Sequence, residues 1–295
     1  MLERQFIRWI NKDRKKGKTL VLYSNKVLYS QQEGTNMKHK EIAVVISQES
    51  ISDGIYSMWL KCPLVAGDAK EGQFISLYCH DGSKILPRPI SICEINKEDG
   101  TLRIVYRVVG GGTEEFSTYS EGTEIEILGP LGNGFTLQPM RSAMLIAGGI
   151  GIPPMVQTAR RLKEEGCSEI NIVVGYRNAD TFLIDELSQY GNVIIATEDG
   201  SVGTKGNVMN AIDEQGVKAD VIYACGPTPM LRAIKEYAIK TDTEAYISME
   251  EKMACGIGAC LACVCKSKEV DHHSHVNNKR VCKDGPVFNV LEVEL

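Results

Sequence analysis

The sequence has no apolar run long enough to cross a membrane. Its longest run, residues 143–156, is broken by three glycines and two prolines, whereas a spanning helix needs about 20 mostly apolar residues. The first 30 residues also lack the uninterrupted apolar core of a secretory signal. We therefore expect a soluble, cytoplasmic protein.

Histidine is scarce, and basic residues are not in excess. The chain has five histidines, and it contains neither a G-x-S-x-G nor an H-E-x-x-H motif. Taking a proton from a carbon substrate needs a positioned base, and no such group of residues is evident, so we expect no catalytic residue in this chain. The net charge of −5 argues against broad nucleic-acid binding.

The composition is otherwise that of an ordinary globular chain. Hydrophobic residues make up 43% and charged residues 24% of the 295 residues, which excludes the disordered and fibrous classes. At about 150 residues per domain, the length predicts two domains.

Residues 1–36 differ from the rest in charge. They contain eight lysines and arginines against three acids, and a second methionine, Met37, follows them. The segment could be a basic arm that docks a partner. It could instead be a loosely ordered leader or a non-native upstream start, which is the interpretation we favour.

Residues 38–139 show a β pattern. Apolar or β-branched runs are separated by turn pairs such as Asp53-Gly54 and Asp99-Gly100, and Thr113–Tyr119 could form a short helix. Six such runs predict a small antiparallel β-barrel: Ile42–Ser47, Ile55–Leu60, Gln73–Tyr78, Ile90–Cys93, Leu102–Val109 and Glu124–Leu128.

Residues 141–249 alternate between strand and helix patterns, which predicts a doubly wound parallel α/β sheet. The expected strands are Ala143–Ala147, Ile170–Tyr176, Val193–Thr197, Val221–Cys225 and Glu244–Met249. The expected helices are one from Pro154 to about Gly166, then Thr181–Tyr190, Asn207–Gln215 and Pro229–Ile239.

Residues 250–295 carry five of the ten cysteines. The spacing Cys255-x4-Cys260-x2-Cys263, with Cys282 further on, is typical of a plant-type [2Fe–2S] cluster. A structural zinc site also takes four thiolates, although it more often uses paired C-x2-C hairpins. We favour a small [2Fe–2S] subdomain.

Two further features of this segment have open roles. Cys265 could be a spare thiol or an alternative ligand. The histidines of the loop 271–275, namely His272, His273 and His275, resemble a metal site, but a polar loop tip is the simpler interpretation.

Two groups of motifs favour nucleotide binding. In the barrel, Arg88–Ser91 and the run Gly110–Thr113 offer an arginine, a hydroxyl and a glycine-rich backbone, which suit a phosphate and a flavin. In the α/β segment, glycine-bearing loops follow two strands at one sheet edge, where a pyridine nucleotide would bind. The residues expected at this NAD site are Gly148, Gly149, Gly151, Cys225, Gly226 and Pro227. The first loop could also be a tight turn without a ligand, and Cys225 a small buried residue.

In this order, the motifs resemble the ferredoxin–NADP reductase superfamily. Over residues 38–295 the chain is more closely similar to the electron-transfer subunits of bacterial NAD-linked dihydroorotate dehydrogenases. The residues that carry this closer similarity are Leu86–Ile92, Ile127–Phe135 and the terminal cysteines.

The resemblance implies FAD and a [2Fe–2S] cluster in this chain, NAD as substrate, and a separate FMN-containing catalytic subunit in a heterotetramer that serves pyrimidine biosynthesis. By position it implies cluster ligands at Cys255, Cys260, Cys263 and Cys282. It also implies FAD contacts at Arg88, Pro89, Ile90, Ser91, Val105, Tyr106, Arg107, Gly112 and Thr113.

Two alternatives stay open at this point. One is the NAD(P)H-handling subunit of another ferredoxin- or sulfide-linked reductase, and the other is a zinc-stabilised binding protein without activity. The loop Tyr176–Asp180 offers one cation, Arg177, and an acid that would repel a 2′-phosphate. We therefore expect NADH to be preferred over NADPH.

Overall fold

The structure is a computed structural model that describes residues 19–23, 26–30, 37–137, 142–270 and 275–295. The chain divides into two units, Met1–Met37 and Lys38–Leu295. In the first unit, β1 (Thr19–Tyr23) and β2 (Lys26–Ser30) form an antiparallel hairpin. The remainder of the predicted leader lies outside the described residues. Within the described ranges, no helix is long and apolar enough to span a membrane.

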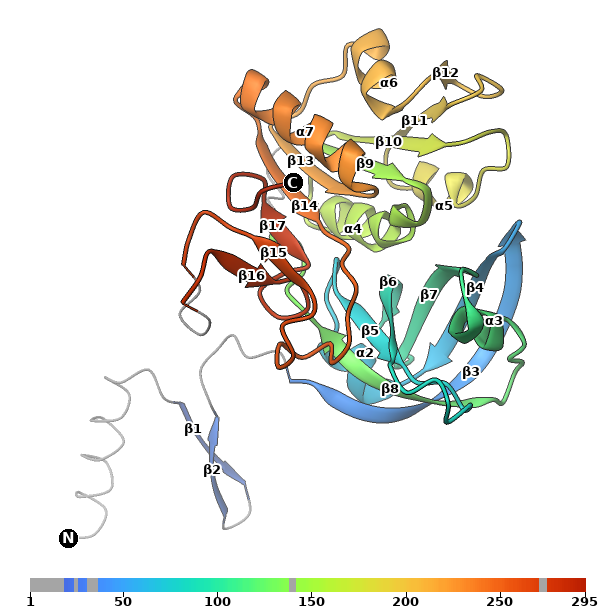
Figure 1. The fold of residues 1–295 in the computed structure, drawn as a ribbon, viewed down its shortest axis with the longest axis vertical. Coiled ribbons are helices and arrows are strands. Elements are labelled where there is room, and N and C mark those ends of the chain that lie inside the picture. Colours follow the sequence, from blue (N-terminus) through green and yellow to red (C-terminus); the bar gives the residue numbers. More distant parts are fainter. Residues whose placement is uncertain (1–18, 24–25, 31–36, 138–141, 271–274) are drawn as a thin grey trace, which may run out of the picture. The chain divides into compact units, whose positions relative to one another are not determined.

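The second unit begins with a closed antiparallel barrel (Figure 1). Its strands are β3 (His39–Ser52), β4 (Ile55–Lys61), β5 (Phe74–Leu77), β6 (Arg88–Asn96), β7 (Thr101–Arg107) and β8 (Glu124–Leu131). They follow one another around the barrel in the order β3-β4-β7-β6-β5-β8. Two short helices, α2 (Pro63–Asp68) and α3 (Gly111–Ser117), lie in the connections. The predicted six-stranded barrel is confirmed.

The strand β7 shows why this sequence forms a barrel that also packs against the next domain. Side chains alternate between the two faces of a strand. Ile104 and Tyr106 therefore lie in the barrel core with Met58. Val105, between them, lies in a second core that is shared with the following α/β segment. Both faces of β7 are buried.

The α/β segment forms a sheet with the order β12-β11-β10-β9-β13-β14-β17. Its parallel strands are β9 (Ala143–Gly148), β10 (Ile170–Tyr176), β11 (Asn192–Thr197), β12 (Thr204–Lys205), β13 (Val221–Cys225) and β14 (Glu244–Ser248). The chain adds β10 and β11 on one side of β9, and then β13 and β14 on the other. The strand order therefore reverses between β9 and β13, which is where ligands bind in such sheets.

Helices cover both faces of this sheet, as Figure 1 shows. Its helices are α4 (Pro153–Glu164), α5 (Ile184–Ser188), α6 (Val208–Gln215) and α7 (Thr228–Thr241), with a short 3-10 turn at Gly149–Gly151. Met144 and Ile146 of β9 pack with residues of α6 and α7. Leu145, between them, packs with residues of α4 and α5. The doubly wound arrangement is confirmed.

The cysteine-rich segment is joined to this sheet. It contains β15 (Val264–Lys266), β16 (Asn278–Arg280) and β17 (Val287–Asn289). β17 pairs antiparallel with β14, so the sheet is mixed where the sequence predicted a purely parallel one. Cys263, Cys282 and Phe288 share one apolar core with the α6 and α7 face of the sheet.

Candidate functional site

Of the four predicted cluster cysteines, three lie in one loop, and Cys282 lies in the turn after β16. Gly256 and Gly258 have φ values of +67° and +85°, which curl the loop around the sulfurs. The N–H of Ala259 points to Cys255 Sγ at 3.3 Å, and the N–H of Gly258 points to Cys282 Sγ at 3.1 Å. Backbone donors of this kind stabilise thiolates in iron–sulfur sites.

The cysteines form two neighbouring pairs, Cys255 with Cys260 and Cys263 with Cys282. Burial raises the pKa of Cys255, but backbone N–H donors and the Cys260 thiol outweigh it and lower that pKa to about 6. Burial and the neighbouring Cys263 raise the pKa of Cys282 to about 12. Within the described residues, no three metal-ligating side chains converge on a single-ion site. Two thiolate pairs with sulfur-directed donors fit a two-iron cluster, in which each iron takes two thiolates.

Cys265 differs from these four cysteines. It is buried in the apolar core, and burial raises its pKa to about 11. This environment suits a spare structural thiol. Of the three histidines of the neighbouring loop, His275 is exposed, while His272 and His273 lie outside the described residues.

The structure brings the two flavin motifs of the barrel together. The guanidinium of Arg88 lies beside Gly112, where a Cβ atom would come within 2.6 Å of Arg88 Cζ. The hydroxyl of Thr113 accepts the N–H groups of Val109 at 2.9 Å and Gly110 at 3.2 Å, which shapes the glycine turn at the start of α3. An arginine fork beside a glycine backbone is suited to a pyrophosphate.

The remaining residues of the predicted FAD site lie on adjoining strands. Pro89, Ile90 and Ser91 of β6 pair with residues 74–76 of β5. The Tyr106 side chain points into the barrel core and donates to Gln48 Oε1 at 2.7 Å, and burial raises its pKa. Val105 is likewise buried. For Val105 and Tyr106, only the backbone is therefore available to a ligand.

The nucleotide loops also meet. β9 and β13 are neighbours, with Ala147 opposite Cys225. A Cβ atom at Gly151 would lie 2.8 Å from Gly226 Cα, so the two loops are in direct contact. Arg107 reaches the first loop from the barrel, with its guanidinium 3.7 Å from the Cβ position of Gly149. Burial raises the pKa of Cys225 to about 12, which suits a neutral thiol.

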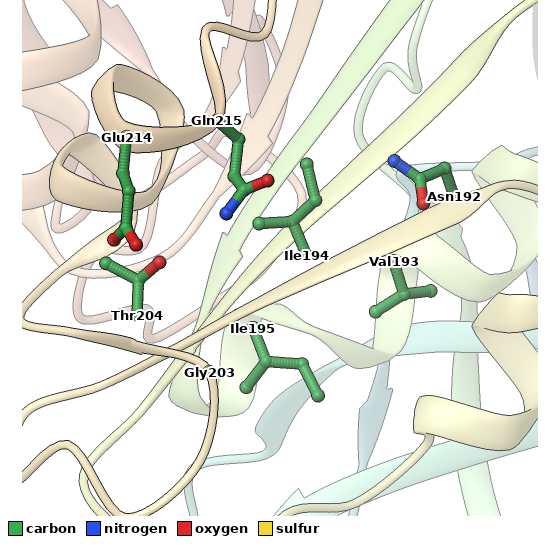
Figure 2. Close-up of a pocket in the computed structure, with 8 residues that line it drawn as sticks. All are labelled: Asn192, Val193, Ile194, Ile195, Gly203, Thr204, Glu214 and Gln215. Atoms are coloured by element: carbon green, nitrogen blue, oxygen red, sulfur yellow. The ribbon is translucent and has the colours of Figure 1, made fainter.

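Two other features are the acid after β10 and a recess beside β11. Asp180 accepts a hydrogen bond from Ser52 Oγ at 2.8 Å, so its carboxylate is engaged by the barrel hairpin. A recess of about 310 Å³ lies between β11 and the end of α6 (Figure 2). It is lined by Asn192–Ile195, Gly203, Thr204, Glu214 and Gln215. It lies beside β11, whereas the predicted nucleotide site lies between β9 and β13.

A contact that the sequence did not predict joins the cluster loop to the barrel. A Cβ atom at Gly256 would lie 3.0 Å from Ser76 Oγ and 3.4 Å from Leu131. Ser76 is buried and is the register partner of Pro89 in the flavin motif. The loop residue after Cys255 is therefore separated by a single strand, β5, from β6, which carries Arg88–Ser91 and is called the flavin strand below.

Two family models match the chain. The iron–sulfur cluster binding domain of dihydroorotate dehydrogenase B matches residues 250–294, and an oxidoreductase NAD-binding domain matches residues 145–236. The dihydroorotate dehydrogenase B (NAD(+)) electron transfer subunit of Listeria monocytogenes is 45% identical over 85% of this chain and 97% of its own. That of Bacillus cereus is 41% identical over 88% of this chain and 100% of its own.

Solved structures share the architecture. An NADH-dependent reduced ferredoxin–NADP oxidoreductase aligns with a TM-score of 0.77 and 30% identity, over 86% of this chain and 90% of its own. Phthalate dioxygenase reductase aligns with a TM-score of 0.57 and 20% identity, over 82% of this chain and 94% of its own. The second similarity concerns the fold alone.

Barrel, NAD-binding sheet and iron–sulfur segment together define a ferredoxin reductase-like oxidoreductase that transfers electrons. Within this class, the chain belongs to the family of electron transfer subunits of dihydroorotate dehydrogenase B (NAD(+)). The expected iron–sulfur cluster and NAD are confirmed by the two matching domain models, and the expected FAD agrees with the ferredoxin reductase-like class. This family membership rules against the alternative of a zinc-stabilised binding protein without activity. The family also implies a partner catalytic subunit.

Proposed function

We propose that the chain passes electrons from an FMN-containing subunit that oxidises dihydroorotate to NAD⁺, by way of a [2Fe–2S] cluster and FAD, in cytoplasmic pyrimidine biosynthesis. We further propose a heterotetramer with two copies of each subunit. The observation that carries the proposal is the contact of Gly256 with Ser76, because it places the cluster loop against the strand that pairs with the flavin motif. When bound, the flavin exchanges a hydride with nicotinamide and single electrons with the cluster.

The cluster ligands in this proposal are Cys255, Cys260, Cys263 and Cys282. Their support is the pairing of the thiols and the backbone N–H groups directed at Cys255 and Cys282. The guanidinium of Arg280 adds rigidity, because it is buried and donates to the Gly258 carbonyl at 3.2 Å. Asp284 accepts from Arg280 Nε at 3.1 Å and so compensates its charge.

The FAD residues in this proposal are Arg88–Ser91, Val105–Arg107, Gly112 and Thr113. Arg88 and the backbone of Gly112 would hold the pyrophosphate, and Ser91 offers a hydroxyl on the same strand. Arg107 would lie between FAD and NAD, because its side chain extends from the barrel to Gly149.

The NAD residues in this proposal line the crevice between β9 and β13: Gly148, Gly149, Gly151, Cys225, Gly226 and Pro227. The glycines permit close backbone approach at the reversal of strand order. A preference for NADH agrees with the acid Asp180 after β10, although Ser52 already hydrogen-bonds this carboxylate.

The partner would cover the surface around the cluster loop. Ile257 and Leu261 are large apolar side chains in the loop of cysteine ligands, and they are 44% and 41% exposed. Their exposure supports a docking role in the complex, where they would also exclude water from the cluster.

Anaerobic co-purification tests this function. The tagged chain should retain a partner whose extracted flavin is FMN, while the chain itself yields FAD, iron and sulfide. The complex should reduce NAD⁺ with dihydroorotate. A partner without FMN, or a complex inactive with dihydroorotate, would contradict the proposal.

A further inference from the structure

The turn after β8 is where the barrel meets the end of the cluster-binding segment. Gly132 in this turn has a φ of +72°, and a Cβ atom there would lie 2.6 Å from the carbonyl oxygen of Gly285. Only glycine combines this backbone conformation with so close an approach. The turn therefore lies directly against the chain three residues after Cys282.

Asn133 stabilises the contact between this turn and the chain after Cys282 with hydrogen bonds. Its side-chain amide nitrogen donates to the carbonyl oxygens of Lys283 at 3.3 Å and Asp284 at 3.0 Å. Its backbone N–H donates to the carbonyl oxygen of Gly285 at 2.6 Å. Three successive carbonyl groups after Cys282 are thus bound by one residue of the barrel.

The same turn is fixed to the flavin strand through Gln73, whose side chain is fully buried. Gln73 Nε2 donates to the carbonyl oxygen of Gly132 at 2.7 Å. The carbonyl oxygen of Gln73 accepts the N–H of Ile92 at 3.0 Å, and Ile92 directly follows Ser91 of the flavin motif. A continuous row of contacts therefore runs from the chain after Cys282 to β6.

We propose that the turn Gly132–Asn133 is a positioning element that fixes the separation between the cluster cysteines and the flavin strand, and so sets the rate of electron transfer between them. This inference rests on the proposed function. In the step concerned, NADH reduces the flavin with two electrons as a hydride. When both cofactors are bound, one electron would then pass from the reduced flavin to the iron of the oxidised cluster, with no bond made or broken. Gly132 and Asn133 ligate neither cofactor and act through the segments they hold.

The first test compares Gly132→Ala with Gly122→Ala in the anaerobic holoprotein. Gly122 is a matched control because its φ is +85° and a Cβ atom there meets nothing within 4 Å. We expect NADH to reduce the flavin at an unchanged rate in both variants. The loss of the cluster's visible absorbance on reduction (bleaching) should be slower in Gly132→Ala, because the rate of electron transfer falls steeply as the two centres move apart. Iron content and the dithionite-reduced cluster spectrum should match the wild type.

The second test compares Asn133→Ala with Asn277→Ala, and it serves if Gly132→Ala does not accumulate as holoprotein. Asn277 also donates its side-chain amide to a backbone carbonyl, that of Lys268 at 3.1 Å, but within the cluster segment. Asn133→Ala should slow cluster bleaching while Asn277→Ala leaves it unchanged. Equal bleaching rates in Asn133→Ala and wild type would overturn the inference.

The outcomes separate this inference from the proposed function. A wild-type protein without flavin, or one whose cluster is not reduced by NADH, would contradict the proposed function. A wild type that behaves as proposed, with variants that bleach equally fast, would contradict only the positioning role.

Discussion

At the scale of single residues, flavin binding should depend most directly on Arg88. We expect Arg88→Ala to weaken FAD binding by about 1.5–3 kcal/mol, the range for a hydrogen bond to a charged group, or roughly tenfold to over a hundredfold in Kd. Retention of FAD after dilution and gel filtration measures the effect. Arg160→Ala removes an arginine paired with Glu164 on the surface of α4 and serves as control. Unchanged FAD content in Arg88→Ala would count against the barrel as the flavin site.

The cysteine assignments are tested by a second pair of substitutions. Cys260→Ser should remove the iron–sulfur absorbance and leave FAD bound, because the two sites lie on different segments. Cys265→Ser should keep the cluster, because this thiol is buried in the apolar core. Iron content and the visible spectrum report both results. If Cys265→Ser loses the cluster and Cys282→Ser retains it, then Cys265 is the fourth ligand and Cys282 is the spare thiol.

The residues that could be predicted from the sequence are those whose chemistry follows from local spacing. Cys255, Cys260 and Cys263 lie within nine residues, and their spacing alone indicates an iron–sulfur site. Ser76, Gln73 and Asn133 could not be found in this way, because their partners are far along the chain. The stretch Leu128–Phe135 could be used in the sequence only as a sign of family resemblance. The contact of its Gly132 with Gly285 could be seen only in the folded structure.

At the scale of elements, the connection between β5 and β6 is held against α3 by Glu115. Its carboxylate accepts hydrogen bonds from Lys84 at 2.8 Å, Tyr119 at 2.6 Å and the N–H of His80 at 2.6 Å. Burial raises the pKa of Glu115, but these donors outweigh it and lower the pKa from 4.5 to about 2. The ionised form therefore stabilises the fold above pH 4.5, and this contribution is lost as the pH falls toward 2.

Glu115→Gln should consequently destabilise the protein at pH 7 by about 1–2 kcal/mol, less than the full pKa shift would give, because solvent screens these partly exposed groups. The difference from wild type should shrink as the pH falls from 4.5 toward 2, because the unfolded wild-type chain takes up a proton at Glu115 that the folded chain takes up only near pH 2. Denaturant unfolding at both pH values measures it. Glu114→Gln, on the same helix, is the control. A stability difference that does not change with pH would contradict the ionic role of Glu115.

Elements with a clear hydrophobic period were predictable, and short ones were not. β10 and β13 have the bounds that the sequence predicted, because a buried parallel strand forms a continuous apolar run. The two-residue β12 and the strand β17 carry too few residues to show a period. The predicted helix Thr181–Tyr190 is shortened to Ile184–Ser188, and Leu183 before it has a φ of +62°.

At the scale of the whole molecule, the cluster surface should determine association with the partner. Leu261→Asp should weaken binding to the FMN subunit and slow electron transfer from dihydroorotate to NAD⁺, because it places a charge on an apolar contact. Transfer from NADH to a dye should persist. Leu64→Asp, at a side chain that is 55% exposed on α2, is the control. Equal affinity of both variants for the partner, measured by calorimetry, would exclude the cluster loop as the docking surface.

The division of labour between this chain and its partner is tested most directly by an anaerobic titration of the isolated chain, followed in the visible spectrum. NADH should bleach both the flavin and the iron–sulfur bands. Dihydroorotate alone should leave the spectrum unchanged, because we expect the base that takes a proton from carbon to lie on the partner subunit. Addition of the FMN subunit should then allow dihydroorotate to bleach both bands. Bleaching by dihydroorotate without any FMN protein would contradict the account, as would a colourless chain that contains zinc.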